Sequence, residues 1–145
     1  MIRLSVPGSL FYRDLVLRVV ESSCKLVQPA LDGVQDARQR GDDFEHELVS
    51  AFGEAFNNVA IHGYRDRPLG EVRIEIEPEP GKLTLRIFDW GRAFDPTAAA
   101  PNAPPNLSES KMGLYIIHSF ADELRYTAGV APDQPNLLEL VKHRH

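Results

Sequence analysis

Residues 71–88 read EVRIEIEPEPGKLTLRIF, and this stretch decides the fold. Apolar and polar residues alternate in two runs, residues 72–76 and residues 83–87. A period of two is typical of strands with one buried face, and residues 78–81 supply a turn between the runs. The stretch therefore predicts an antiparallel hairpin. Its buried face is expected to hold Val72, Ile74, Ile76, Leu83, Leu85 and Ile87.

Two helices are expected upstream of this hairpin. Residues 44–62 carry apolar side chains at helical spacing, and Gly63 is a typical helix terminator. One face of this helix is expected to hold Leu48, Phe52, Ala55 and Val59. An earlier helix is expected to begin after Ser9, an N-capping residue, and to end near Pro29. Its apolar residues at helical spacing are Phe11, Leu15, Val19 and Leu26.

The remaining segments complete the expected fold. Residues 30–43 and residues 95–111 are predicted to be loops, and the second is long enough to be a functional lid. A third helix is expected from Gly113 to about Leu124. Further strands are expected at residues 2–6, 125–128 and 137–141. The whole chain, residues 1–145, is thus expected to be one α+β domain, with three main helices on one face of a mixed, mostly antiparallel β-sheet.

The composition argues against several classes of partner. The chain has 16 Lys and Arg against 21 Asp and Glu, a net charge of −5, and its basic residues are scattered. Nucleic acids and anionic membranes are held by concentrated positive charge, so neither is expected as a partner. Cys24, the only cysteine, lies in an apolar stretch and is expected to be a buried packing residue. With no signal-peptide profile and no apolar run near 20 residues, a cytoplasmic location is expected.

The first group of candidate site residues belongs to the second helix, which reads EAFNNVAIHGY from Glu54 to Tyr64. Glu54 and Asn58 are four residues apart, so they share one side of a helix, with His62 one turn further on. A carboxylate and an amide oxygen in one column suit a magnesium ion that keeps most of its waters. Asn57 is an alternative to Asn58 as the metal ligand. A solvated polar face is the alternative to a site.

The second group directly follows the hairpin, where residues 89–96 read DWGRAFDP. If the strand continues, Asp89 points to the same side as Leu85 and Ile87, toward the helices. A carboxylate there needs hydrogen-bond donors, and the exocyclic amine of a purine is one suitable donor. Gly91 would let the backbone approach a flat ligand. The alternative is a turn aspartate that caps its own loop.

The third group is expected at the N-terminus of the third helix and comprises Ser110, Lys111, Met112 and Gly113. Free backbone N–H groups and the helix dipole make such a terminus a site for anions. Gly113 would let a phosphate approach the main chain. Ordinary helix capping is the alternative.

The three groups occur in the order, and at roughly the spacing, of the N, G1 and G2 boxes of the GHKL superfamily of histidine-kinase-like ATPases. Residues 54–64, which close in His-Gly-Tyr, resemble the bacterial anti-sigma-factor serine/threonine kinases in particular. The similarity runs from about Leu48 to Tyr126. It implies a Bergerat-type two-layer sandwich, with ATP bound between the helices and the lid.

The resemblance also implies roles for single residues. Glu54 matches the general base, Asn58 the magnesium ligand, and Asp89 the adenine-binding carboxylate. With ATP and Mg²⁺ as cofactors, the implied binding set is Asn58, Asp89, Gly91, Ala93, Phe94, Ser110, Lys111, Met112 and Gly113. Two positions depart from the family pattern: Ala93 stands where glycine is frequent, and Lys111 replaces the first glycine of the G2 box. Lys111 either restricts the backbone beside the phosphates or offers them its ammonium group.

By this resemblance, the expected function is that of an ATP-dependent serine kinase in a bacterial partner-switching system. Such a kinase binds a sigma factor, phosphorylates a small antagonist protein, and can form a homodimer. The alternative is a binding module of the same fold that sequesters a partner with little or no turnover. A helix-on-sheet domain unrelated to nucleotides is a third interpretation.

Overall fold

The computed structural model describes residues 1–29, 37–97 and 109–145, without the side chains of residues 37–42, 109 and 110. Its sheet has the strand order β1-β2-β3-β5-β4, and every pair of neighbours is antiparallel in the described residues. The strands are β1 (Ile2–Pro7), β2 (Glu71–Glu79), β3 (Lys82–Asp89), β4 (Glu123–Thr127) and β5 (Asn136–His143). The α+β fold is as expected, and the sheet has no parallel pair in the described part.

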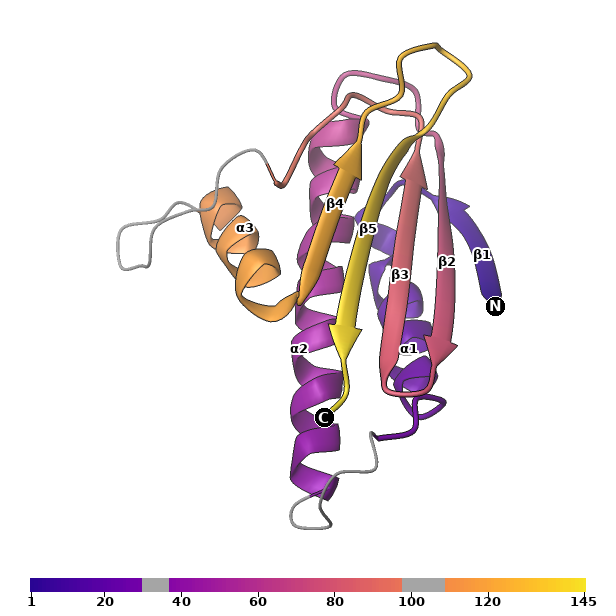
Figure 1. Ribbon diagram of the computed structural model, residues 1–145. Helices are drawn as coiled ribbons and strands as arrows, with labels where there is room; N and C mark the ends of the chain where they lie inside the picture. The colour runs from indigo at the N-terminus through magenta and orange to yellow at the C-terminus, as the bar shows by residue number, and fades with distance from the viewer. Residues whose placement is uncertain (30–36, 98–108) are drawn as a thin grey trace.

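Helices cover one face of this sheet. They are α1 (Arg13–Cys24), α2 (Ala37–Asn58) and α3 (Glu109–Phe120), with a 3₁₀ turn at Leu10–Tyr12 and a π-helical turn at Val59–Gly63. Figure 1 shows α1 and α2 side by side behind the strands, and α3 next to α2 on the β4 side. None of the helices in the described ranges is long and apolar enough to cross a membrane.

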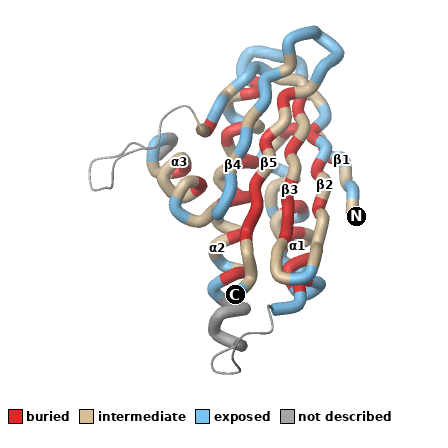
Figure 2. The backbone as a smooth tube through the Cα atoms, viewed as in Figure 1, coloured by how far each residue is buried: buried red, intermediate tan, exposed pale blue. Residues whose placement is uncertain are grey.

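The hairpin of β2 and β3 is paired as predicted, with Ile74 opposite Ile87. All six residues of its predicted apolar face are at most 2% exposed. They share one core with Leu48, Phe52, Ala55 and Phe56 of α2. Val59, the last residue of the predicted face, is only partly buried and begins the π-helical turn. Figure 2 shows the buried stretches in red on the central strands and on the helices behind them. Cys24 is 2% exposed, and burial raises its pKa to about 12, so it is a packing residue as predicted.

The boundaries of all three helices differ from the prediction, and α1 is shorter than expected, Arg13–Cys24 instead of ending near Pro29. α2 begins at Ala37, so Gly41 lies inside a helix where a loop was predicted. α3 begins at Glu109 and ends at Phe120, which places Gly113 inside the helix and not at its entrance. Leu124, the predicted end of this helix, belongs to β4. For α3, packing against α2 accounts for the difference, because tertiary contacts override the local preference of a glycine.

The orientation of α1 is the second difference. Of the apolar residues that the sequence singled out, Phe11 is 88% exposed, Leu15 54% and Leu26 58%. The residues that pack into the core are instead Val16, Val20, Cys24 and Val27. Apolar side chains occupy more than one side of this helix, so periodicity alone did not identify the buried face.

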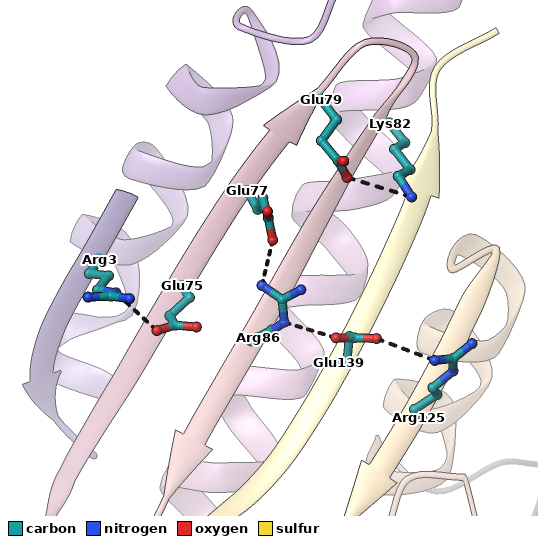
Figure 3. Close-up of polar contacts among 8 residues, drawn as sticks. All are labelled: Arg3, Glu75, Glu77, Glu79, Lys82, Arg86, Arg125 and Glu139. Atoms are coloured by element: carbon teal, nitrogen blue, oxygen red, sulfur yellow. Dashed lines mark hydrogen bonds and ion pairs between the residues drawn. The ribbon is translucent and has the colours of Figure 1, made fainter. Parts of the chain in front are cut away.

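The outer face of the sheet carries charged side chains that pair across the strands (Figure 3). Arg86 of β3 contacts Glu77 of β2 at 2.7 Å and Glu139 of β5 at 2.9 Å. Arg125 of β4 extends this row, with Nη1 3.9 Å from Glu139. The row therefore links four strands through side chains, in addition to the backbone ladder.

Arg86→Met should lower the melting temperature at pH 7 by about 2–4 °C, because it leaves two carboxylates of the row without their shared cation. The Arg86 guanidinium lowers the pKa of Glu77, so the stabilisation is present above the ordinary glutamate pKa and is lost as the pH falls through the lowered value. In thermal melts from pH 7 to pH 3, the melting temperatures of the wild type and of Arg86→Met should thus become more similar as the pH falls. Arg3→Met, which removes a single ion pair whose arginine is more exposed, is the control. Equal melting temperatures of the wild type and Arg86→Met at pH 7 would show that the row of charged side chains does not stabilise the fold.

Candidate functional site

The second helix of the chain changes its winding where the candidate site lies. After Asn58 the α-helix becomes a π-helical turn, Val59–Gly63, and such turns are frequent at functional sites. An open hollow of about 650 Å³ faces this end of the helix. Its lining residues are Glu54, Asn57, Asn58, Ile61, His62, Met112 and Gly113. The structure thus brings the first predicted group together with part of the third.

Glu54 lies directly against the first half of α3. A Cβ atom added to Gly113 would lie 2.6 Å from Oε2 of Glu54, which is closer than real contacts allow. Glycine at position 113 therefore lets the helix approach the carboxylate. Glu54, the predicted general base, and Gly113, the predicted glycine of the G2 box, are therefore neighbours, although they belong to separate groups in the sequence.

Asn58 lies at the buried end of the hollow and is 7% exposed. Its Nδ2 is buried and has no hydrogen-bond partner in the described part of the chain. An unpaired buried donor costs about 1–3 kcal/mol, so an oxygen of a ligand would relieve a real cost here. The amide of Asn58 is thus a group that a bound molecule would satisfy.

Asn57, the alternative metal ligand, has its oxygen engaged elsewhere. Its Oδ1 accepts a hydrogen bond from Nε of Arg13 at 2.7 Å. A guanidinium carries only donors, so it turns the oxygen of this amide, and not its nitrogen, toward Arg13. Of the two neighbouring asparagines, Asn58 is therefore the one with a buried amide nitrogen, Nδ2, that has no hydrogen-bond partner among the described residues.

Asp89 is the last residue of β3 and points to the helical side of the sheet, as the alternation of the strand predicted. It is 5% exposed, and burial raises the pKa of its carboxyl. Its Oδ1 accepts hydrogen bonds from the backbone N–H of Gly91 at 3.0 Å and from Nδ2 of Asn136 at 3.1 Å. Asp89 therefore caps its own loop, as the alternative interpretation predicted, but it does so only through Oδ1. Its Oδ2 has no hydrogen-bond partner among the described residues.

The loop after Asp89 is fixed against the end of the second helix. The backbone N–H of Arg92 donates to the carbonyl of Gly63 at 2.5 Å. A Cβ atom at Gly91 would collide with the backbone of Gly63, so the loop approaches the helix closely only because residue 91 is glycine.

A stacked pair of rings separates Asp89 from the open hollow. The rings of His62 and Phe94 lie 4.6 Å apart between centroids and are nearly parallel, at 10°. His62 lines the hollow, whereas Phe94 lines a cavity of about 20 Å³ next to Asp89. That volume is enough for about one water molecule and far too small for a purine. A purine can therefore reach Asp89 only if this loop moves.

A family model of histidine kinase-like ATPase domains matches residues 20–142. The chain belongs to this family. Its relatives include the anti-sigma F factor of Clostridium botulinum (strain Eklund 17B / Type B), 29% identical over 68% of this chain and 64% of that protein. The anti-sigma F factor of Anoxybacillus flavithermus (strain DSM 21510 / WK1) is 32% identical over 67% of this chain and 68% of that protein. The chain thus spans about two thirds of the length of these relatives.

The fold itself is shared with a solved histidine kinase domain. The histidine kinase domain of the Erythrobacter litoralis EL346 blue-light activated histidine kinase superimposes with a TM-score of 0.55. The match covers 96% of this chain and 62% of that one, at 17% sequence identity. Membership of an ATPase family makes ATP the expected ligand of the site.

The two departures from the family pattern lie at the surface of this histidine kinase-like domain. Ala93 and Lys111 are both exposed. Lys111 is in the first turn of α3, and in the described residues Asp66 is the only non-glycine with a positive φ. The backbone at position 111 is thus helical, and a lysine adopts it without strain. Met112 lines the hollow, and the side chain of Ser110 lies outside the described part.

Two residues that shape the site were not among the predicted ones. Asn136 donates to Asp89 from the directly opposite position on β5. Arg13 reaches Asn57 from α1. Neither could be found from local sequence, because each partner lies more than 40 residues away along the chain.

Proposed function

We propose that this domain is an ATP-dependent serine kinase of a partner-switching system, which binds a sigma factor and phosphorylates a small antagonist protein. The observation that carries the proposal is the placement of Glu54 and Asn58 side by side on one hollow, beside Gly113. A carboxylate and an unsatisfied amide at one site suit phosphoryl transfer, in which positioning and charge stabilisation supply most of the catalysis. Relatives named anti-sigma F factor support this choice of partner.

In this proposal each residue has a separate task. Glu54 accepts the proton of the serine hydroxyl while the serine oxygen bonds to the γ-phosphorus and the bond from that phosphorus to the β–γ bridging oxygen breaks, which releases ADP. Asn58 contacts the phosphates through its amide. Asp89 accepts a hydrogen bond from the adenine amine through Oδ2, and Gly91 and Phe94 border the base. Met112 and the backbone around Lys111 border the phosphate end.

A magnesium ion fits this donor set, because Mg²⁺ binds few protein oxygens and otherwise keeps water and phosphate ligands. Asn58 is the residue that would hold it, and the ion would supply neutralisation of the phosphate charge. A cytoplasmic location follows from the proposed partners, since sigma factors act on transcription. A homodimer stays part of the proposal on the basis of family resemblance.

Asn58→Ala tests the site. It should remove the magnesium dependence of ATP binding, because the alanine offers neither an oxygen to the metal nor a donor to the phosphates. Calorimetric titration with ATP, with Mg²⁺ and with EDTA, gives the readout. Glu21→Gln, an exposed change on α1 outside the hollow, is the control. A variant in which magnesium still strengthens ATP binding as in the wild type would remove Asn58 from the metal site.

The choice between kinase and binding module needs an activity measurement. The wild-type domain should transfer the label of [γ-³²P]ATP to the serine of an antagonist-type protein encoded near its gene. ATP binding without transfer to any such partner would favour the binding module. Absence of ATP binding would contradict the kinase proposal and leave the binding module or a domain unrelated to nucleotides.

A further inference from the structure

The contact between Arg13 and Asn57 joins the start of α1 to the end of α2 at the edge of the hollow. Nε of Arg13 donates to Oδ1 of Asn57 at 2.7 Å, and the contact is partly buried. In the described part of the chain no carboxylate forms an ion pair with Arg13. Asp14, the next residue, pairs instead with Arg18, at 2.9 Å. The guanidinium is therefore committed to a neutral amide and not to an acid.

The space that Arg13 occupies is shaped for it. A Cβ atom on Gly53 would lie 2.7 Å from Nη2 of Arg13 and 3.4 Å from Cδ2 of Leu17. Gly53 is buried inside α2, where glycine costs about 1 kcal/mol relative to alanine. Glycine at position 53 thus destabilises the helix but leaves room for the guanidinium of Arg13.

The contact fixes which way the amide of Asn57 faces. If the amide were rotated by 180°, its NH₂ group would face the Nε–H of Arg13, and two donors would oppose each other. The oxygen therefore stays with Arg13, and the NH₂ group is the end of Asn57 that remains for a ligand. Asn57 lines the hollow together with Glu54 and Asn58, so a donor is available next to the proposed base.

We infer that Asn57 donates a hydrogen bond from Nδ2 to a phosphate oxygen of the bound nucleotide, and that Arg13 is the positioning residue that holds it in this orientation. This inference rests on the proposed function, because it assumes that ATP occupies the hollow. It assigns the neighbouring asparagines different tasks. Asn58 supplies the oxygen ligand of the metal together with its own amide donor, whereas Asn57 supplies a donor alone.

Asn57→Asp tests the direction of this hydrogen bond. The aspartate keeps the contact with Arg13, now as an ion pair, but replaces the donor with a carboxylate oxygen. It should weaken ATP binding at least about tenfold, because an anionic acceptor then faces phosphate. If Asn57 were a metal ligand, the carboxylate would bind Mg²⁺ better and strengthen magnesium-dependent ATP binding. That opposite sign would overturn the inference.

Gly53→Ala and Arg13→Gln test the positioning role. Gly53→Ala should displace the guanidinium and weaken ATP binding a few-fold, although alanine raises the melting temperature of a helix or leaves it unchanged. Arg13→Gln should have a similar effect on affinity and none in an Asn57→Ala background, because it acts through that amide. Arg18→Gln, on the same helix with an exposed ion pair, should leave affinity unchanged.

Calorimetry and thermal melts of all variants distinguish this inference from the function on which it rests. Wild-type ATP binding with unchanged affinity in Asn57→Asp and Gly53→Ala would reject the role of Asn57 and leave the proposed function intact. An additive effect of Arg13→Gln in the Asn57→Ala background would reject the positioning role of Arg13. A wild-type domain that binds no ATP would reject both the inference and the proposed function.

Discussion

Glu54→Gln will bind ATP with nearly wild-type affinity and will phosphorylate a serine substrate about 10²–10⁴-fold more slowly. A general base contributes to the transition state and little to ground-state binding, so the loss should appear in kcat. Glutamine has almost the same shape as glutamate, so its packing against Gly113 should persist. Steady-state phosphorylation of an antagonist-type protein, together with calorimetric ATP titration, gives both quantities.

The control for this variant is Glu21→Gln, which removes an exposed carboxylate of α1 that does not line the hollow. It should match the wild type in binding and in rate. If Glu54→Gln phosphorylates as fast as the wild type, the kinase proposal stands and the base must be another residue. If both binding and rate fall together, Glu54 serves to hold the nucleotide and not to accept the proton.

The parts of this site that the sequence predicted are those set by local periodicity. The alternation through Leu85 and Ile87 fixed the side of the sheet that Asp89 faces, and the structure has it buried on that side. The spacing of Glu54 and Asn58 placed both on one face of α2, and both line the hollow. Each of these features depends on residues within one element, so the period of that element determines them.

The features that were missed depend on contacts between distant elements. The sequence of α1 has apolar residues on several sides, and only its packing on α2 and β2 selects Val16 and Val20 as the buried ones. The contact of Arg13 with Asn57 depends on the same packing of α1. The π-helical turn and the stacking of His62 on Phe94 cannot be predicted from the spacing of apolar residues either. The local sequence pattern was therefore enough to select the candidate site residues. The contacts that fix their side chains depend on tertiary structure.

Asp89→Asn will abolish detectable binding of adenine nucleotides while the fold is retained. The reason lies in the two carboxylate oxygens of Asp89. Its Oδ1 already accepts from Gly91 and Asn136, and an asparagine can keep both bonds through its own oxygen. The amide NH₂ then replaces Oδ2 and would face the amine of adenine, donor against donor.

The stability of the same variant provides an internal check on the state of Asp89. Burial raises the pKa of this carboxyl, so its ionised form destabilises the folded state at pH values above the folded pKa. The melting temperature of Asp89→Asn at pH 7 should thus equal or exceed that of the wild type. As the pH falls through the raised pKa, the wild type regains this stability and the difference should narrow. A lower melting temperature of the variant at pH 7 would show that the carboxylate is needed for folding.

Calorimetric titration with ATP and ADP measures the loss of binding, and Asp133→Asn, an exposed change in the turn before β5, is the matched control. Trp90, the only tryptophan, directly follows Asp89, so its fluorescence reports whether the loop keeps its native environment. Native fluorescence and melting with no nucleotide binding is the expected combination. An unchanged dissociation constant in Asp89→Asn would mean that the adenine ring binds elsewhere. The small cavity beside Phe94 would then have no role in adenine binding.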